Sequence, residues 1–221
     1  MNRIFVLFFS LVAVGLGGCT VSTPSTISYV KPDFSNANEN QVIVAASFDD
    51  SWNQLIAGLS ADFFVINNIE KASGLITLDF SGVLPEQFVD CGVTSRTYGE
   101  RAFKYEVAGD AEFLLDQKYG VNVARKTIQR NASLNGKINV HVSEVSEGTR
   151  VTVNARYMWS VIVGGTYRLA GSLATGPSYR IDSETYTKTF NSNSASVANG
   201  PNDFTCGATG FLEKKILSII H

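Results

Sequence analysis

The segment 149–163 constrains the fold most, because its side chains alternate in character over its whole length. One face carries only apolar residues, namely Val151, Val153, Ala155, Tyr157, Trp159, Val161 and Val163. The other face is mainly polar, with Met158 and Ile162 as exceptions. A period of two is typical of a strand that packs one face on a core. We therefore predict a long half-buried strand, which Gly164-Gly165 ends or interrupts with a bulge.

Other segments predict further strands. They cover residues 42–47, 63–66, 75–80, 103–107, 136–145 and 178–190. The tract 124–131 is mostly polar and contains Arg125, Lys126 and Arg130. We interpret this tract as an exposed edge strand, since charged residues are typical of sheet edges.

Three segments predict helices. The first covers residues 49–60, where Ser47 offers an N-cap and Trp52, Leu55 and Leu59 recur at helical spacing. The others cover residues 110–119 and 208–220. We therefore expect an α+β fold, with helices packed on one face of an antiparallel sheet. Residues 42–221 would form this single domain.

The N-terminus predicts a signal peptide at residues 1–18. Arg3 precedes an apolar core at residues 4–16, and Leu16-Gly17-Gly18-Cys19 follows. An ordinary cleaved signal and a membrane anchor are the alternatives, but a spanning helix needs about 20 apolar residues.

The tetrapeptide ending at Cys19 resembles the lipobox of bacterial lipoproteins. That resemblance implies cleavage before Cys19 and attachment of acyl chains such as palmitate to it. Thr20, rather than Asp, resembles the default for sorting to the outer membrane, with the domain facing the periplasm. Residues 19–41 would then form a lipidated flexible tether, since they are rich in Ser, Thr, Asn and Pro.

Cysteine usage agrees with an oxidising compartment. If Cys19 carries lipid, Cys91 and Cys206 remain, and we predict a disulfide between them. Two buried free thiols are the alternative. The formal net charge is −2, from 18 basic and 20 acidic residues. This balance argues against a nucleic-acid partner, which would require a basic patch.

Residues 47–80 resemble a helix-grip unit. Ser47, Asp49 and Trp52 mark the helix start, and Gly74 precedes the second strand of the unit. A similar unit occurs in the lipoprotein C family of the outer-membrane β-barrel assembly machinery. The resemblance covers 34 of 221 residues and implies a fold, without carrying over any binding residue.

The chain shows no pattern typical of catalysis or metal binding. His141 stands on a polar strand face without partners at ligand spacing, and Asp182 and Glu184 lie two apart on one strand. We therefore expect no catalytic residue, no metal and no cofactor. Trp52 and Trp159 are either core residues or the lining of an apolar cavity.

These observations favour a non-enzymatic envelope lipoprotein that binds a protein partner or acts as a scaffold at the outer membrane. Arg125 and Arg130 would contact the partner, which would add a strand at the edge 124–131. The alternative is a module that binds a lipid or other apolar ligand between helix and sheet, with Trp52 and Trp159 beside it. An enzyme with an unrecognised site is a third hypothesis, and the oligomeric state stays open.

Overall fold

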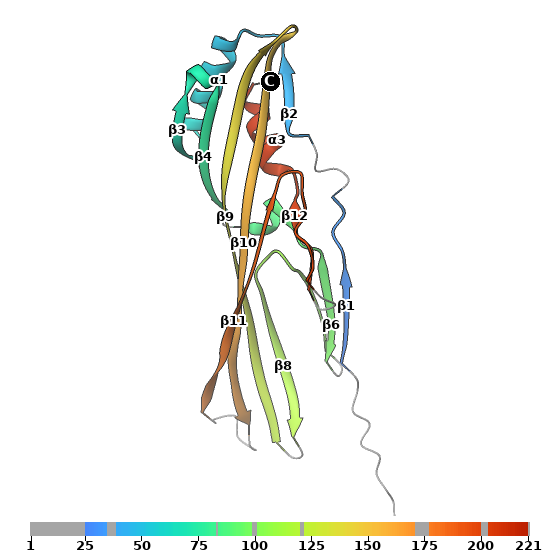
Figure 1. Cartoon of the computed structure of the whole chain (residues 1–221). Coiled ribbons are helices and arrows are strands. Elements are labelled where there is room, and N and C mark those ends of the chain that lie inside the picture. Colours follow the sequence, from blue (N-terminus) through green and yellow to red (C-terminus); the bar gives the residue numbers. More distant parts are fainter. Residues whose placement is uncertain are drawn as a thin grey trace, which may run out of the picture.

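One antiparallel hairpin runs nearly the full length of the computed structural model (Figure 1). Its strands are β9 (Asn122–Val145) and β10 (Gly148–Ala170), and all 23 residues of β10 have a partner on β9. The structure describes residues 25–34, 39–82, 84–98, 101–119, 122–170, 177–199 and 203–220. Each long strand has two further strands in series along its outer side, so the hairpin joins two halves of the molecule.

The upper half in Figure 1 surrounds the turn of the hairpin. There β2 (Gln41–Val44) pairs with β10, β4 (Leu75–Gly82) pairs with β9, and β3 (Val65–Glu70) pairs with β4 as the edge. The 3-10 helix η1 (Lys71–Ser73) joins β3 to β4 and ends at Gly74 in the left-handed conformation, which suits glycine. Alternate residues of β4, β9 and β10 point into one apolar core, and Ile66 of β3 and Val42 and Val44 of β2 pack against it.

Two helices close this core. The helix α1 (Phe48–Ser60) starts at Ser47, whose hydroxyl accepts a hydrogen bond from the Asp50 amide at 3.1 Å. Its buried face includes Trp52, Leu55 and Leu59, as the helical spacing predicts. The helix α3 (Phe211–Leu217) and the 3-10 helix η2 (Ser218–Ile220) lie beside it.

The core also contains a buried polar pair. Tyr157 on β10 is fully buried, and its hydroxyl donates to both carboxylate oxygens of Glu213 on α3, at 2.8 and 3.0 Å. Burial, reinforced by the Glu213 charge, raises the pKa of Tyr157. This pair fixes α3 to the hairpin at one position.

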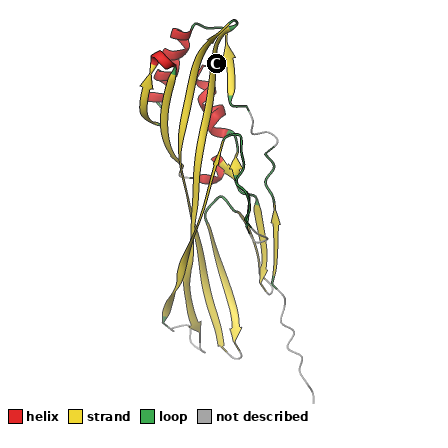
Figure 2. Cartoon of the chain, in the orientation of Figure 1, coloured by secondary structure: helices red, strands yellow, loops and turns green. Residues whose placement is uncertain are grey.

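The lower half is built from strands. β8 (Ala111–Tyr119) pairs with the first part of β9, and β11 (Ser178–Asn191) pairs with the second part of β10. The pairing with β11 shifts register between Val163 and Gly165, which confirms the bulge as one of the two predicted outcomes. Figure 2 shows the described helices in the upper half and at the waist only.

A separate three-stranded sheet lies beside the lower half. It consists of β1 (Thr26–Val30), β6 (Val93–Tyr98) and β7 (Arg101–Glu106), in that order. Short elements form the waist between the halves: α2 (Pro85–Phe88), β5 (Val89–Asp90) and β12 (Gly207–Ala208), the last two paired with each other.

The predicted fold class is wrong. We expected an α+β fold with helices packed on one face of an antiparallel sheet. The structure is mostly β, with several antiparallel sheets and α-helices of only 13, 4 and 7 residues. The physical reason is that β8, predicted as a helix, and the first part of β9 extend the sheet beyond the helices, while β6 and β7 belong to a further sheet.

Three local predictions also fail. Residues 110–119 form strand β8 rather than a helix, because pairing with β9 overrides their helix propensity. The tract 124–131 is not an edge, since β8 and β10 flank it on both sides. Part of the expected tether is ordered as β1, where Tyr29 donates to the Cys91 carbonyl at 3.1 Å.

Replacing Tyr157 with Phe tests the buried polar pair. We expect Tyr157→Phe to lower the free energy of unfolding by about 1–3 kcal/mol, because it leaves the Glu213 carboxylate buried without its donor. Adding Glu213→Leu removes the unpaired group and should recover part of the loss. Urea denaturation of both variants measures this, and a loss below about 0.5 kcal/mol for Tyr157→Phe would contradict the pair's role.

Candidate functional site

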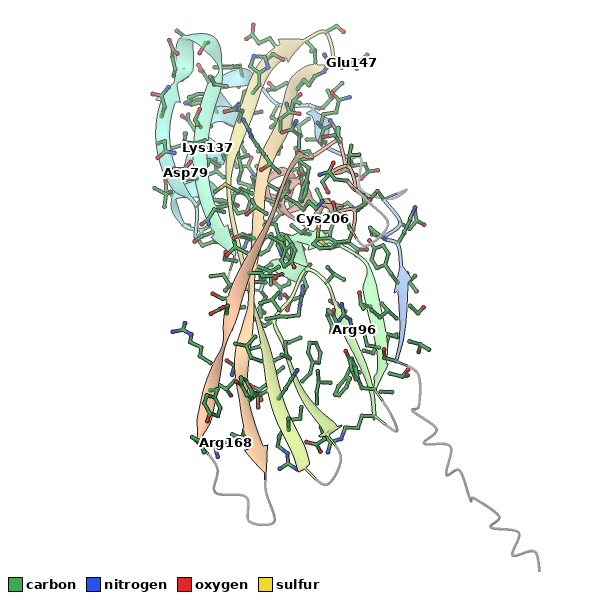
Figure 3. All side chains as sticks on the ribbon, turned by 60° about the horizontal axis from the view of Figure 1, so that its bottom comes forward. Asp79, Arg96, Lys137, Glu147, Arg168 and Cys206 are labelled. Carbon is green, nitrogen blue, oxygen red and sulfur yellow. A yellow bond between two sulfur atoms is a disulfide. The ribbon has the colours of Figure 1, made fainter. Side chains whose placement is uncertain are left out.

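The two downstream cysteines are joined. Cys91 and Cys206 form a disulfide across 115 residues of sequence, and both are fully buried. The prediction from cysteine usage is therefore confirmed. The bond lies at the waist beside the β5–β12 pair, where Figure 3 labels Cys206. Cys19, the predicted lipidation site, lies outside the described residues.

Both tryptophans lie in the hydrophobic core. Trp52 is 4% exposed, and Trp159 is fully buried. The Trp159 indole donates from Nε1 to the Ala108 carbonyl at 2.8 Å, and its ring packs edge-on against Phe204. Both indoles are therefore core residues, and neither lines any of five clefts found in the described part of the chain.

Arg130 is buried between the lower half and the three-stranded sheet. Its guanidinium donates to the Val107 carbonyl at 3.0 Å and lies over the Tyr105 ring, 5.0 Å from the centroid. Burial lowers the pKa of this guanidinium. Arg130 therefore joins two sheets inside the protein rather than facing a partner.

Arg125 is exposed and belongs to a second link between the same two sheets. Its Nε donates to Asp116 on β8 at 2.9 Å, and Arg101 on β7 donates to the other oxygen of that carboxylate at 2.9 Å. Arg101 also donates to the Leu114 carbonyl on the edge of β8. The hydrogen bond from Arg125 lowers the pKa of Asp116, so the carboxylate stays charged between two arginines.

Because residues 124–131 are internal, the strands that can accept a partner strand lie elsewhere. The edge β3 is only six residues long and carries a register shift between Ile66 and Asn68, both of which protect an edge. The edge of β8 is partly covered, since Arg101 binds the Leu114 carbonyl and Phe113 packs against Tyr105 of β7.

The edge of β11 differs from both. It is 14 residues long, and within the described chain it has a strand partner on one side only, β10. Almost all of residues 178–187 are exposed, including Tyr179 at 42% and Tyr186 at 43%. This part of β11 is therefore the longest accessible sheet edge in the lower half.

The hydrogen bonds at the top of β11 show which amides face outward. The Ser192 amide donates to the Ala155 carbonyl of β10 at 2.9 Å, whereas the Asn191 amide donates away from β10, to Ser194. Amide direction alternates along an antiparallel strand. The amides of Thr185 and Thr187 therefore point to the open edge, and the Tyr186 amide points to β10.

A buried ion pair holds the upper part of β11 in place. Lys188 donates to Asp203 at 2.6 Å, and only 10% of the Lys188 side chain is exposed. Burial opposes the charged form of Asp203, but hydrogen bonds from Lys188 and from the Asn199 and Phe204 amides outweigh it and lower the pKa of this carboxyl. These bonds fasten Asn199, Asp203 and Phe204 to β11.

No catalytic constellation emerges from the described side chains. His141 lies exposed on β9, and no group of three or more His, Cys, Asp or Glu in the described ranges could hold a metal ion. Glu184 accepts a hydrogen bond from Tyr186, which raises the pKa of that tyrosine, and Asp182 is exposed nearby.

A cleft of about 760 Å³ opens between β7 and the segment 109–113. Its polar lining consists of Glu86, Lys104, Glu106, Asp110 and Glu112, with Phe103 and Tyr105 as the aromatic part.

No helix in the described chain has the length and apolar character required to cross a membrane.

Removal of the disulfide tests how much it contributes to the free energy of unfolding. We expect Cys91→Ala with Cys206→Ala to lower the free energy of unfolding by about 2–5 kcal/mol, because the bond closes a long loop in the unfolded chain. Urea denaturation without reductant measures the difference, and Cys19→Ala serves as the control that removes a cysteine elsewhere. A double variant as stable as this control would contradict the expectation.

The Lys188–Asp203 pair predicts a pH dependence of stability. Since folding lowers the pKa of Asp203, its contribution is complete above the unfolded value near 3.9 and is lost as pH falls through the folded value. We expect the free energy of unfolding to fall less between about pH 5 and pH 2 in Asp203→Asn than in the wild type. Parallel curves for the two proteins would contradict this assignment.

Comparison with known proteins identifies no relative. No family model, no curated protein and no solved structure matches this chain. Any function proposed for the chain therefore rests on its own residues and their geometry.

Proposed function

We propose that this chain is a lipid-anchored envelope lipoprotein, attached to the outer membrane through Cys19 and facing the periplasm, that binds a protein partner by strand addition at β11. One observation carries the binding role: residues 178–187 form a long exposed edge that, within the described part of the chain, has a strand partner on one side only. Main-chain hydrogen bonds to such an edge give affinity, and neighbouring side chains give specificity.

The surroundings of this edge define the partner's chemistry. On the inner face of the sheet, Tyr179, Ile181 and Tyr186 flank the edge, and on the outer face Thr185 and Thr187 do so. A strand added here would meet aromatic and aliphatic groups on one face and hydroxyls on the other. The fitting partner is thus an extended segment with alternating apolar and polar residues.

The rest of the proposal comes from the N-terminal sequence. The short apolar core and the lipobox-like Leu16-Gly17-Gly18-Cys19 support lipidation, and the disulfide suits an oxidising periplasm. Cys19→Ala should abolish acylation and release the protein from the membrane fraction. Mass spectrometry of the N-terminal peptide from the native protein checks this directly.

The ligand-binding alternative receives no comparable support. It needs a cavity beside Trp52 and Trp159, and both indoles are packed into the core. The proposed partner contact also moves from Arg125 and Arg130 to the β11 edge, because Arg130 is buried and Arg125 forms an ion pair with Asp116.

Paired substitutions at the open edge test strand addition. The partner is first identified by crosslinking the native protein in its own cells and by mass spectrometry. Thr185→Pro with Thr187→Pro removes two edge-facing amides but leaves the hydrogen bonds to β10 intact. We expect the affinity for the purified partner to fall about tenfold or more, since each lost hydrogen bond contributes about 0.5–1.5 kcal/mol.

The matched control is Thr185→Ala with Thr187→Ala, which removes the same side chains and keeps both amides. This control should bind nearly as well as the wild type, and thermal unfolding should show both variants folded. Equal affinities for the proline and alanine variants would refute strand addition at β11.

A further inference from the structure

Positive side chains gather at the lower end of the molecule, where the strands of the lower half end. We call this set the basic end; its members are Arg101, Arg125, Lys126, Arg168 and Arg180. They come from four strands, β7, β9, β10 and β11. Figure 3 labels Arg168 at this end and Glu147 at the opposite one.

Strand register brings these residues together. Arg168 lies opposite Arg125, and Tyr167 lies opposite both Lys126 and Tyr179. Arg180 pairs with Thr166, one residue before Tyr167, and Arg101 reaches the cluster through Asp116. The register thus brings residues far apart in sequence to one end of the sheet, with Arg125, Arg168 and Arg180 on one face and Lys126 with the two tyrosines on the other.

The charge of this surface contrasts with that of the whole chain. Among the described side chains, Asp116 is the one carboxylate that forms ion pairs with these five cations, whereas the whole chain carries a formal net charge of −2. The next carboxylates on these strands, Glu112, Asp182 and Glu184, lie further from the end. Asp116 binds Arg101 and Arg125, and no ion pair engages Arg168 or Arg180 within the described residues.

Tyrosines accompany the cations. The rings of Tyr167 and Tyr179 stack with centroids 5.0 Å apart, and Tyr179 is 42% exposed. Tyr98, at the end of β6, is 43% exposed. Tyrosine and arginine side chains together are typical of surfaces at the headgroup level of a bilayer.

The N-terminal chain enters the structure at this same end. Thr26, the first residue of β1, lies opposite Thr97, which pairs with Ala102 beside Arg101. Cys19 precedes Thr26 by seven residues, which span at most about 25 Å when fully extended. An acyl anchor on Cys19 would therefore keep the basic end close to the membrane.

We infer that the basic end binds a membrane surface of anionic phospholipid headgroups, so that the protein stands on the bilayer with its hairpin turn pointing away. The nearness of the membrane rests on the proposed lipid anchor, but the charge and the tyrosines act without it. Attraction to headgroups adds a second, electrostatic contact to the contact that the anchor makes.

Vesicle binding by a chain without the anchor tests this inference. The protein from residue 19 with Cys19→Ser contains every described residue and carries no lipid. We expect it to sediment with vesicles of phosphatidylglycerol and phosphatidylcholine at low salt, and to bind pure phosphatidylcholine vesicles far more weakly. Raising the salt should weaken binding, because the Debye length falls to about 10 Å at 0.1 M.

Charge reversal locates the contact. Arg168→Glu with Arg180→Glu should lower the affinity for the anionic vesicles at least about tenfold. Each basic residue near an anionic surface raises the affinity about fivefold. The control is Arg150→Glu with Lys214→Glu, which reverses two exposed charges in the upper half and should retain binding.

Two results would overturn the inference: no binding of the Cys19→Ser protein to anionic vesicles, or equal losses in the two reversal variants. If the Cys19→Ser protein does not bind vesicles, and the Arg168→Glu, Arg180→Glu variant no longer crosslinks to the partner, then the basic end binds a protein instead of a membrane. An unacylated Cys19 in the native protein would refute the anchor alone and would leave the vesicle result as it stands.

Discussion

The continuous pairing of β9 with β10 is the constraint on which the rest of the structure depends. Its 23 residue pairs run without a register shift, so alternate side chains keep one inner face from Ala124 to Val142. A slip by one residue would turn every inner side chain outward, so the buried Trp159 and Tyr157 fix the register along the whole hairpin. The lower half has no helix among its described residues, and its strands take their position from this ladder.

The same inner face packs against different elements in the two halves, and this difference separates the apolar core from the proposed binding surfaces. In the upper half it packs against α1 and α3, and the apolar core lies there. In the lower half, Phe113 and Arg130 on this face pack against Tyr105 of β7. The β11 edge and the basic end therefore lie in the half that is further from the apolar core.

How far the sequence could predict this structure depends on how local each signal is. The Ser47 cap, the Trp52 stripe of α1 and the alternation of residues 149–163 reflect short-range periodicity, and the structure bears them out. Residues 110–119 contain good helix formers, and only pairing with β9 makes them a strand. The tract 124–131 has the polar composition of an edge strand because Arg130, rather than an apolar side chain, contacts the segment of β7 and Val107 there. Which strand lies at an edge depends on pairing, so the β11 site could not be located from the sequence.

Hydrogen exchange under native conditions tests whether β9 and β10 form one cooperative ladder across both halves. We expect the hydrogen-bonded amides of the hairpin to be protected to a similar degree beside β4 and beside β8, and to lose protection together as denaturant is added. Amides beside β8 that exchange like those of loops, while those beside β4 stay protected, would contradict it. The lower half would then be a separately opening unit rather than part of one ladder.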